Sequence, residues 1–177
     1  MSDIDIYTWS DIDAICKKLA ATIEGDFDVV VCMLRGGAIP GVIIANELNI
    51  QEVLAIKVIQ KGQVSGAGQG NGAYEPEEGA ILVPLNDYDL EGRRVLVVDD
   101  VLDSGESAKL VLEEVGKRRP ALVKLAVMQK KTYSKIEPDF YVEVKSNWLF
   151  YPWMSSSELK EMKERLVRQE TNTEGDK

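Results

Sequence analysis

The chain has 177 residues, of which 45% are hydrophobic and 29% are charged, and its formal net charge is −9. This length suits one domain with a single substantial core. An acidic chain lacks the basic surface that neutralises nucleic-acid phosphates, so we expect no nucleic-acid partner. The sequence contains no histidine, which excludes a histidine-based catalytic triad and a histidine metal site.

The cysteines and the apolar runs favour a cytoplasmic protein. Cys16 and Cys32 lie on apolar faces of an expected helix and an expected strand, without a CxxC spacing, so we expect buried, reduced thiols. The first residues are acidic, and no apolar run approaches the length of a membrane span. We therefore expect no membrane partner.

Helix and strand signals alternate along the first third of the chain. Ser10 caps an expected helix whose apolar residues follow three-four spacing. A strand is predicted over residues 27–34, a helix with Pro40 in its first turn runs to about residue 48, and another strand covers residues 52–58. These units predict a doubly wound α/β fold with a mainly parallel sheet and helices on both faces.

Residues 62–79 interrupt this alternation. They include six of the 14 glycines and show no hydrophobic period, and a strand predicted over residues 81–85 follows them. A structureless connection of this length inside a domain is usually a disordered linker or an active-site lid. Because a further strand of the same sheet follows, we interpret the segment as a lid.

A buried strand that ends on acids is the most informative part of the chain. Residues 95–98 are apolar and β-branched, as in a central parallel strand, and Asp99 and Asp100 follow at its carboxyl end, where such sheets bind ligands. The turn at residues 104–107 opens a helix predicted to end near residue 118, and its free N–H groups can hold a phosphate. Carboxylates beside a phosphate indicate a sugar phosphate with ribose hydroxyls or hydrated Mg²⁺. Solvated acids on a structural strand, or the acid pocket of a response regulator, are the alternatives.

This stretch, VLVVDDVLDSGES (residues 95–107), resembles the motif with which type I phosphoribosyltransferases bind 5-phosphoribosyl 1-pyrophosphate (PRPP). The resemblance implies that Asp99 and Asp100 bind the ribose hydroxyls and Mg²⁺, with Asp99 as the metal ligand, directly or through water. It implies that Asp103 is the acid/base residue that handles the proton at purine N7. The implied 5′-phosphate loop consists of Asp103, Ser104, Gly105, Glu106 and Ser107. Glu106 is an acid where many relatives have a neutral residue, so its side chain must point to solvent.

A second strand-to-helix turn contains Arg35, Gly36 and Gly37. Two glycines let the backbone approach a ligand, and an arginine at the end of a strand can clamp an oxyanion such as pyrophosphate. A surface arginine on a helix-entry turn is the alternative. The stretch LRGGAIPG (residues 34–41) is similar to the pyrophosphate loop of bacterial xanthine-guanine phosphoribosyltransferases. That similarity implies pyrophosphate binding by these three residues and a cis peptide between Leu34 and Arg35.

The last third of the chain contains the candidate base site. A strand predicted over residues 122–128 is followed by Lys130, which could donate to a carbonyl oxygen, although solvated lysines are the alternative. Six-oxopurine phosphoribosyltransferases place a lysine there to recognise purine O6, which implies this role for Lys130, with Lys131 as the first alternative. The stretch NWLFYPW (residues 147–153) resembles the hood of the xanthine-guanine enzymes. It implies purine binding by Trp148, through stacking, and by Leu149, whereas packing is the usual role of such aromatics.

We therefore predict a single phosphoribosyltransferase domain over residues 1–177. The hood covers about residues 138–153 with an N-terminal contribution, a capping box opens an amphipathic helix over about residues 156–169, and we expect residues 170–177 to be disordered.

The resemblance implies a purine salvage enzyme that joins PRPP and a six-oxopurine base to give a purine nucleotide and pyrophosphate. Mg²⁺ would be held mainly by PRPP oxygens, and relatives are dimers or tetramers, so we expect a homo-oligomer. Two alternatives stay open: an adenine or pyrimidine phosphoribosyltransferase, and a non-enzymatic nucleotide-sensing regulator on the same fold.

Overall fold

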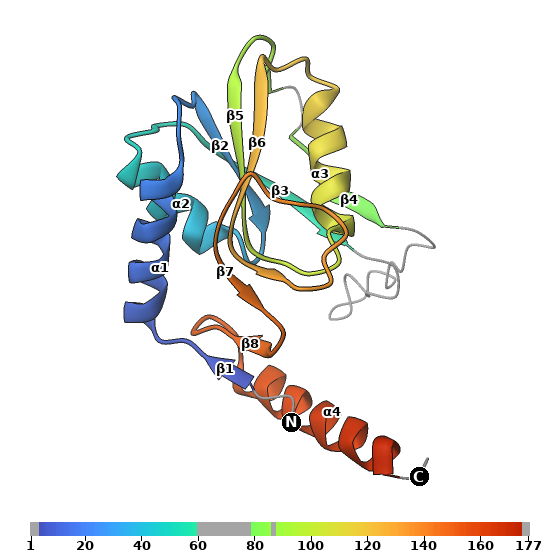
Figure 1. Ribbon diagram of the computed structural model, residues 1–177. Helices are drawn as coiled ribbons and strands as arrows, with labels where there is room; N and C mark the ends of the chain where they lie inside the picture. Colours follow the sequence, from blue (N-terminus) through green and yellow to red (C-terminus); the bar gives the residue numbers. More distant parts are fainter. Residues whose placement is uncertain (1–3, 60–78, 86–87, 175–177) are drawn as a thin grey trace, which may run out of the picture.

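A central sheet with helices on both faces forms the body of the computed structural model, which describes residues 4–59, 79–85 and 88–174 (Figure 1). The six strands follow the order β4 (Ala80–Val83), β3 (Val53–Ile59), β2 (Val29–Leu34), β5 (Arg94–Leu102), β6 (Leu122–Lys131) and β7 (Phe140–Lys145). β3 and β4 are antiparallel, whereas all other neighbouring strands of this sheet are parallel. The predicted doubly wound, mainly parallel α/β fold is therefore confirmed.

Each face of the sheet has its own apolar cluster. The helices α1 (Trp9–Thr22) and α2 (Ala38–Glu47) cover one face, and α3 (Glu106–Gly116) covers the other (Figure 1). Val30 and Cys32 of β2 belong to the α1/α2-side cluster, whereas Val29 and Val31 belong to the α3-side cluster. Successive side chains of a strand point to opposite faces, so a strand covered on both faces needs a continuous apolar run.

The N-terminal helix begins earlier than the sequence predicted. Thr8, rather than Ser10, is the N-cap of α1, and Ser10 lies in the first turn. The Asp11 backbone N–H donates to Thr8 Oγ1 at 3.3 Å, and the Thr8 N–H donates to Asp11 Oδ2 at 2.7 Å. This reciprocal capping box satisfies two N–H groups. Ser10 also has an acid three residues later, Asp13, but that carboxylate pairs with Lys17.

Cys16 and Cys32 are free and buried, as predicted. Burial, assisted by the charge of Asp13, raises the pKa of the Cys16 thiol to about 12. Burial, assisted by the charge of Asp99, raises the pKa of the Cys32 thiol to about 11. Both thiols therefore stay protonated at neutral pH and act as small apolar side chains.

A separate two-stranded sheet joins the beginning of the chain to the hood. β1 (Ile4–Ile6) and β8 (Trp148–Phe150) are parallel, with Asp5 opposite Leu149. In Figure 1 this small sheet lies beyond the end of β7, between the central sheet and the C-terminal helix. The N-terminal strand is therefore part of the hood's framework.

The C-terminal helix α4 (Ser156–Glu174) points away from the central sheet (Figure 1). Its first turn contains the expected capping box, in which the Glu158 N–H donates to Ser155 Oγ at 3.3 Å and the Ser155 N–H donates to Glu158 Oε2 at 2.7 Å. The helix continues past the predicted end at residue 169, because no glycine or proline occurs in this stretch before Gly175.

Two sequence predictions concern segments that the structure does not describe. The interpretation of residues 62–79 as a lid falls almost entirely on residues 60–78, which lie outside the described residues, as does the end of the expected C-terminal tail, residues 175–177. Within the described part of the chain, no helix is both long and apolar enough to cross a membrane.

The contact between α2 and β2 gives a stability prediction. A Cβ atom at Gly41 of α2 would lie 2.2 Å from Cys32 Sγ, so Gly41→Ala should lower the free energy of unfolding by about 1–3 kcal/mol through overpacking. Thermal unfolding measures this. Gly116→Ala is the matched control, because a Cβ at Gly116 meets nothing within 4 Å. Combining Gly41→Ala with Cys32→Ala should recover part of the loss; equal melting temperatures for Gly41→Ala and Gly116→Ala would contradict the packing argument.

Candidate functional site

The candidate site lies where the strand order reverses. From β2 the chain continues outward to β3 and β4, and from β5 it continues in the opposite direction to β6 and β7. The carboxyl ends of β2 and β5 are therefore neighbours at the switch point of the sheet, which is where open α/β sheets bind ligands. β2 ends directly before the arginine loop, residues 35–37. The two acids lie in the last part of β5, which continues to Leu102 instead of ending before them as the sequence predicted.

The arginine loop packs directly on the acids. A Cβ atom at Gly36 would lie 2.2 Å from Asp100 Oδ2, and one at Gly37 would lie 2.3 Å from the Val98 carbonyl oxygen. No side chain fits at either position, so both glycines are needed for this close approach. The peptide between Leu34 and Arg35 is cis, as the family resemblance implied. The structure thus brings together two predicted groups of site residues that the sequence separates by about sixty positions.

The two acids bond to their own backbone. The Asp100 N–H donates to Asp99 Oδ1 at 2.9 Å, and the Val101 N–H donates to Asp100 Oδ1 at 2.7 Å. Burial, together with the neighbouring Asp100 carboxylate, raises the pKa of Asp99 well above its usual value. Burial raises the pKa of Asp100 to about 6. A pair of carboxylates that is desolvated in this way favours a partner that supplies hydroxyl donors or positive charge.

The alternation of side chains changes at these acids. Val98 and Val101 both pack against the α1/α2-side cluster, whereas Val97 and Leu102 belong to the α3-side cluster. Strict alternation would place Val98 and Leu102 on the same face. The change occurs where the amides of Asp100 and Val101 bond to carboxylates, and the paired residues of β5 and β6 omit Asp100.

A corresponding change on β6 places Lys131, and not Lys130, on the face toward the hood. Met128 belongs to the α1/α2-side cluster, and the next residue, Gln129, accepts a hydrogen bond at 2.9 Å from the hydroxyl of Tyr151 in that cluster. Lys131 follows Gln129 by two positions and is buried, with its ammonium donating to the Asn147 carbonyl oxygen, directly before Trp148. Lys131, rather than Lys130, therefore contacts the hood.

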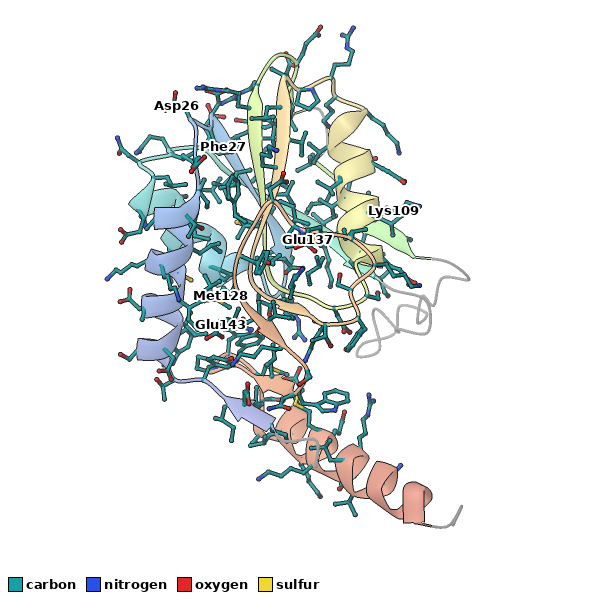
Figure 2. The ribbon with its side chains drawn as sticks, in the orientation of Figure 1. Asp26, Phe27, Lys109, Met128, Glu137 and Glu143 are labelled. Carbon is teal, nitrogen blue, oxygen red and sulfur yellow. The ribbon has the colours of Figure 1, made fainter. Side chains whose placement is uncertain are left out.

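Lys130 points elsewhere. Its ammonium pairs with the Glu137 carboxylate, labelled in Figure 2, and lies 4.7 Å from the centre of the Tyr141 ring. The sequence predicted that the strand ends at Met128, so alternation along the strand could not be used to predict which side of the sheet each lysine occupies. β6 in fact runs to Lys131.

The expected phosphate loop, residues 103–107, turns into α3 through a glycine. Gly105 is the N-cap of α3 and has a φ of 89°, a left-handed conformation that favours glycine. Ser104 Oγ accepts from the Glu106 N–H at 3.4 Å, and Ser107 lies in the first turn of α3. The Glu106 carboxylate is exposed and lies 3.4 Å from the Lys135 ammonium, so its charge has a nearby counter-ion.

Asp103 is exposed and accepts a hydrogen bond from the Tyr133 hydroxyl at 2.5 Å. Burial, this hydrogen bond and the charge of Asp103 raise the pKa of Tyr133 to about 12, so the phenol remains a donor at neutral pH. The Lys135 N–H also donates to the Ser104 carbonyl oxygen at 3.2 Å. The segment after β6 therefore braces the phosphate loop, a contact that no sequence motif indicated.

Arg35 and the hood have further contacts that the sequence did not reveal. The Arg35 side chain is 84% exposed, and its Nη2 lies 3.7 Å from Glu158 Oε1 in the first turn of α4. An exposed pair at this distance contributes little free energy, so the guanidinium can change partner. In the hood, the Leu149 side chain is buried in the α1/α2-side cluster, so any contact with a purine must come from its backbone.

The donor set fits a partly hydrated magnesium ion. Asp99 and Asp100 offer carboxylate oxygens, the ligands that Mg²⁺ prefers, and two carboxylates leave the rest of an octahedral shell to waters and substrate oxygens. Among the described residues, no group of three or more acidic or cysteine side chains is arranged around a metal position.

Comparison with known proteins gives a consistent result. Residues 5–154 match the family model described as a phosphoribosyl transferase domain. Over 151 residues the chain is 31% identical to a xanthine-guanine phosphoribosyltransferase of Gluconobacter oxydans, covering 82% of each protein.

Two solved structures are similar over most of this chain. The purine phosphoribosyltransferase of Pyrococcus horikoshii has a TM-score of 0.73 and 30% identity, covering 86% of this chain and 95% of that one. A Neisseria gonorrhoeae protein with bound ppGpp has a TM-score of 0.73 and 26% identity, covering 93% and 96%.

The raised pKa of Asp100 predicts how stability depends on pH. The folded protein retains this proton up to about pH 6, whereas an unfolded aspartate loses it near pH 4, so stability falls as the pH rises through that window. Asp100→Asn removes the buried charge and should raise the melting temperature at pH 8 by about 2–6 °C, with a smaller gain at pH 4. Differential scanning calorimetry measures both, with exposed Glu24→Gln as control. A lower melting temperature for Asp100→Asn at pH 8 would contradict this.

Proposed function

The chain belongs to the phosphoribosyl transferase domain family and is a phosphoribosyltransferase, and from this premise we propose that its substrates are PRPP and a six-oxopurine. The enzyme would transfer the 5-phosphoribosyl group from PRPP to N9 of guanine, xanthine or hypoxanthine, releasing pyrophosphate. The names of the Gluconobacter and Pyrococcus relatives support the purine class. The ppGpp bound to the Neisseria relative combines a six-oxopurine with diphosphate groups, which agrees with a site for both.

The position of Lys131 supports a six-oxopurine as the base. This buried ammonium lies against the Asn147 carbonyl oxygen, beside the segment proposed to stack on the purine. A lysine has donors only, so it can pair with a carbonyl at the purine six-position but gives an amino group no acceptor. We therefore propose Lys131, instead of Lys130, as the residue that recognises O6.

The other groups take the roles that their positions at the switch point support. Asp99 and Asp100 would bind the ribose hydroxyls, and Asp99 would hold Mg²⁺ directly or through water. The ion, when bound with PRPP, offsets the negative charge of the departing pyrophosphate. Arg35 would leave Glu158 to bind pyrophosphate together with the amides of Gly36 and Gly37.

Asp103 would act as the general acid/base at purine N7 while C1′ becomes oxocarbenium-like. Asp103 lies in the loop that would hold the 5′-phosphate, so the same turn positions the sugar and the acid/base group. The Tyr133 hydroxyl, which donates to Asp103, would orient the carboxylate until the base arrives. Catalysis would therefore consist of positioning and charge stabilisation.

The direct test is turnover with a panel of bases. Purified protein with Mg²⁺ and PRPP should release pyrophosphate with guanine, xanthine or hypoxanthine, and much more slowly with adenine, because an unmatched buried donor can reduce kcat/KM by several powers of ten. Faster turnover with adenine or a pyrimidine would overturn the assignment. Light scattering on the same sample tests the expected dimer or tetramer.

The two adjacent lysines provide a matched pair of variants. Lys131→Gln should reduce the ratio of kcat/KM for guanine over adenine by at least about tenfold, because the glutamine amide, unlike an ammonium, can also accept a hydrogen bond from the adenine amino group. Lys130→Gln should leave that ratio nearly unchanged. Trp148→Ala should weaken all accepted bases alike, by about 1–3 kcal/mol for a lost stacking platform. If selectivity fell only in Lys130→Gln, the roles of the two lysines would be reversed.

The acids can be separated by their effects on binding and turnover. Asp103→Asn should lower kcat by about 10²–10⁴-fold through loss of proton handling, with little change in the Kd for PRPP. Asp99→Asn together with Asp100→Asn should instead weaken PRPP binding. Calorimetric titration and single-turnover kinetics measure the two quantities. Loss of PRPP affinity with unchanged turnover in Asp103→Asn would show that the roles are assigned wrongly.

A further inference from the structure

A closed ring of polar contacts connects the end of β6 to the hood through the N-terminal strand. We call it the polar ring; Glu143, labelled in Figure 2, is its member near the centre of β7. Its successive contacts are Gln129 Nε2 to Glu143 Oε2 at 3.3 Å, Glu143 Oε2 to Lys145 Nζ at 3.4 Å, Lys145 Nζ to Asp5 Oδ2 at 3.0 Å, Asn147 Nδ2 to Asp5 Oδ1 at 3.0 Å, and Lys131 Nζ to the Asn147 carbonyl oxygen. Because Gln129 and Lys131 both belong to β6, the ring closes on that strand.

The ring is partly shielded from water, most completely at its two members on β6. Gln129 is fully buried, Lys131 is 8% exposed, and the side chains of Asp5 and Lys145 are each about one quarter exposed. The hydrogen bond from Asn147 lowers the pKa of Asp5. Although partial burial acts in the opposite direction, the contact with Asp5 raises the pKa of Lys145. Both groups are therefore charged at neutral pH, and their contacts are stronger than those of surface pairs.

Asp5 is the member that ties the N-terminal strand to the other two elements. β1 has three residues and pairs with a β8 of equal length, and so short a two-stranded sheet is marginal by itself. One Asp5 oxygen contacts Lys145 at the end of β7, and the other accepts from the Asn147 side chain. Asp5 therefore fixes Asn147, the residue directly before Trp148.

We propose that Asp5 is a positioning residue for the purine base. By holding the Asn147 side chain, it directs the Asn147 carbonyl oxygen toward Lys131, and one of the three donors of that ammonium is thereby occupied. The remaining donors then point in fixed directions, so less side-chain entropy is lost when O6 binds. This inference rests on the proposed function, and it adds that base recognition depends on a residue that touches no substrate.

Kinetic constants of Asp5 variants test the proposal. Asp5→Asn keeps an acceptor for Asn147 but loses the charge that holds Lys145, whereas Asp5→Ala loses both. We expect the KM for guanine to rise about threefold in Asp5→Asn, the effect of one lost hydrogen bond. In Asp5→Ala we expect a rise of about 10- to 30-fold, the effect of losing a charged pair. The KM for PRPP and kcat should stay within about twofold. Asp5→Glu, which keeps the charge, should restore part of the base affinity.

The controls separate positioning from general destabilisation. Asp13→Asn removes an exposed carboxylate that pairs with Lys17 in α1, and it should change neither KM. A merely structural role for Asp5 predicts that the KM values for guanine and PRPP rise together, or that neither changes, and either result overturns the proposal. In a Lys131→Gln background, Asp5→Ala should raise the KM for guanine much less than it does in the wild type.

Hydrogen exchange gives a readout that does not require turnover. The amides of β8 should exchange faster in Asp5→Ala than in the wild type, while those of β5 and β6 keep their protection. Unchanged exchange in β8 would contradict the proposal. Failure of the proposed function has a different signature, because the wild type itself would then release no pyrophosphate with any six-oxopurine.

Discussion

The close approach of the arginine loop to the acids of β5 is the constraint on which the site depends. Gly36 and Gly37 leave no room for a Cβ atom against Asp100 and the Val98 carbonyl. This approach places a cationic side chain and two carboxylates at the same switch point, so one ligand can meet both. The carboxylates are desolvated by the same packing, which explains their raised pKa values and their need for a polar partner.

Much of this site could be predicted because its motifs are continuous in the sequence. A buried β-branched strand ending on acids, and an arginine followed by two glycines, each define a strand end and a turn within a few residues. The parallel order of the strands then brings such ends together. The α/β fold followed from the alternation of helix and strand signals, whereas the cis peptide before Arg35 was implied only by the family resemblance.

The remaining parts depend on contacts that local patterns do not encode. Lys131 faces the hood where strict alternation would place Lys130, since the alternation of both β5 and β6 changes beside the acids, and an ideal period of two does not anticipate such a change. The contact of Arg35 with Glu158, and that of Asp103 with Tyr133, join residues far apart in sequence. Thr8 and Ser10 are each followed three residues later by an aspartate, Asp11 and Asp13, so the local pattern does not distinguish the two as N-cap.

The pairing of β1 with β8 also determines the order in which the two halves of the site can fold during synthesis. Asn147 and Asp5 are 142 positions apart, whereas the arginine loop and the acids lie at β2 and β5, both within the first 102 residues of the chain. During synthesis the N-terminal part of a chain emerges first, and contacts of long sequence separation form late. The half of the site made by β2 and β5 can therefore assemble while the ribosome is still translating, but the hood half must wait for the last strand, with the first strand left unpaired until then.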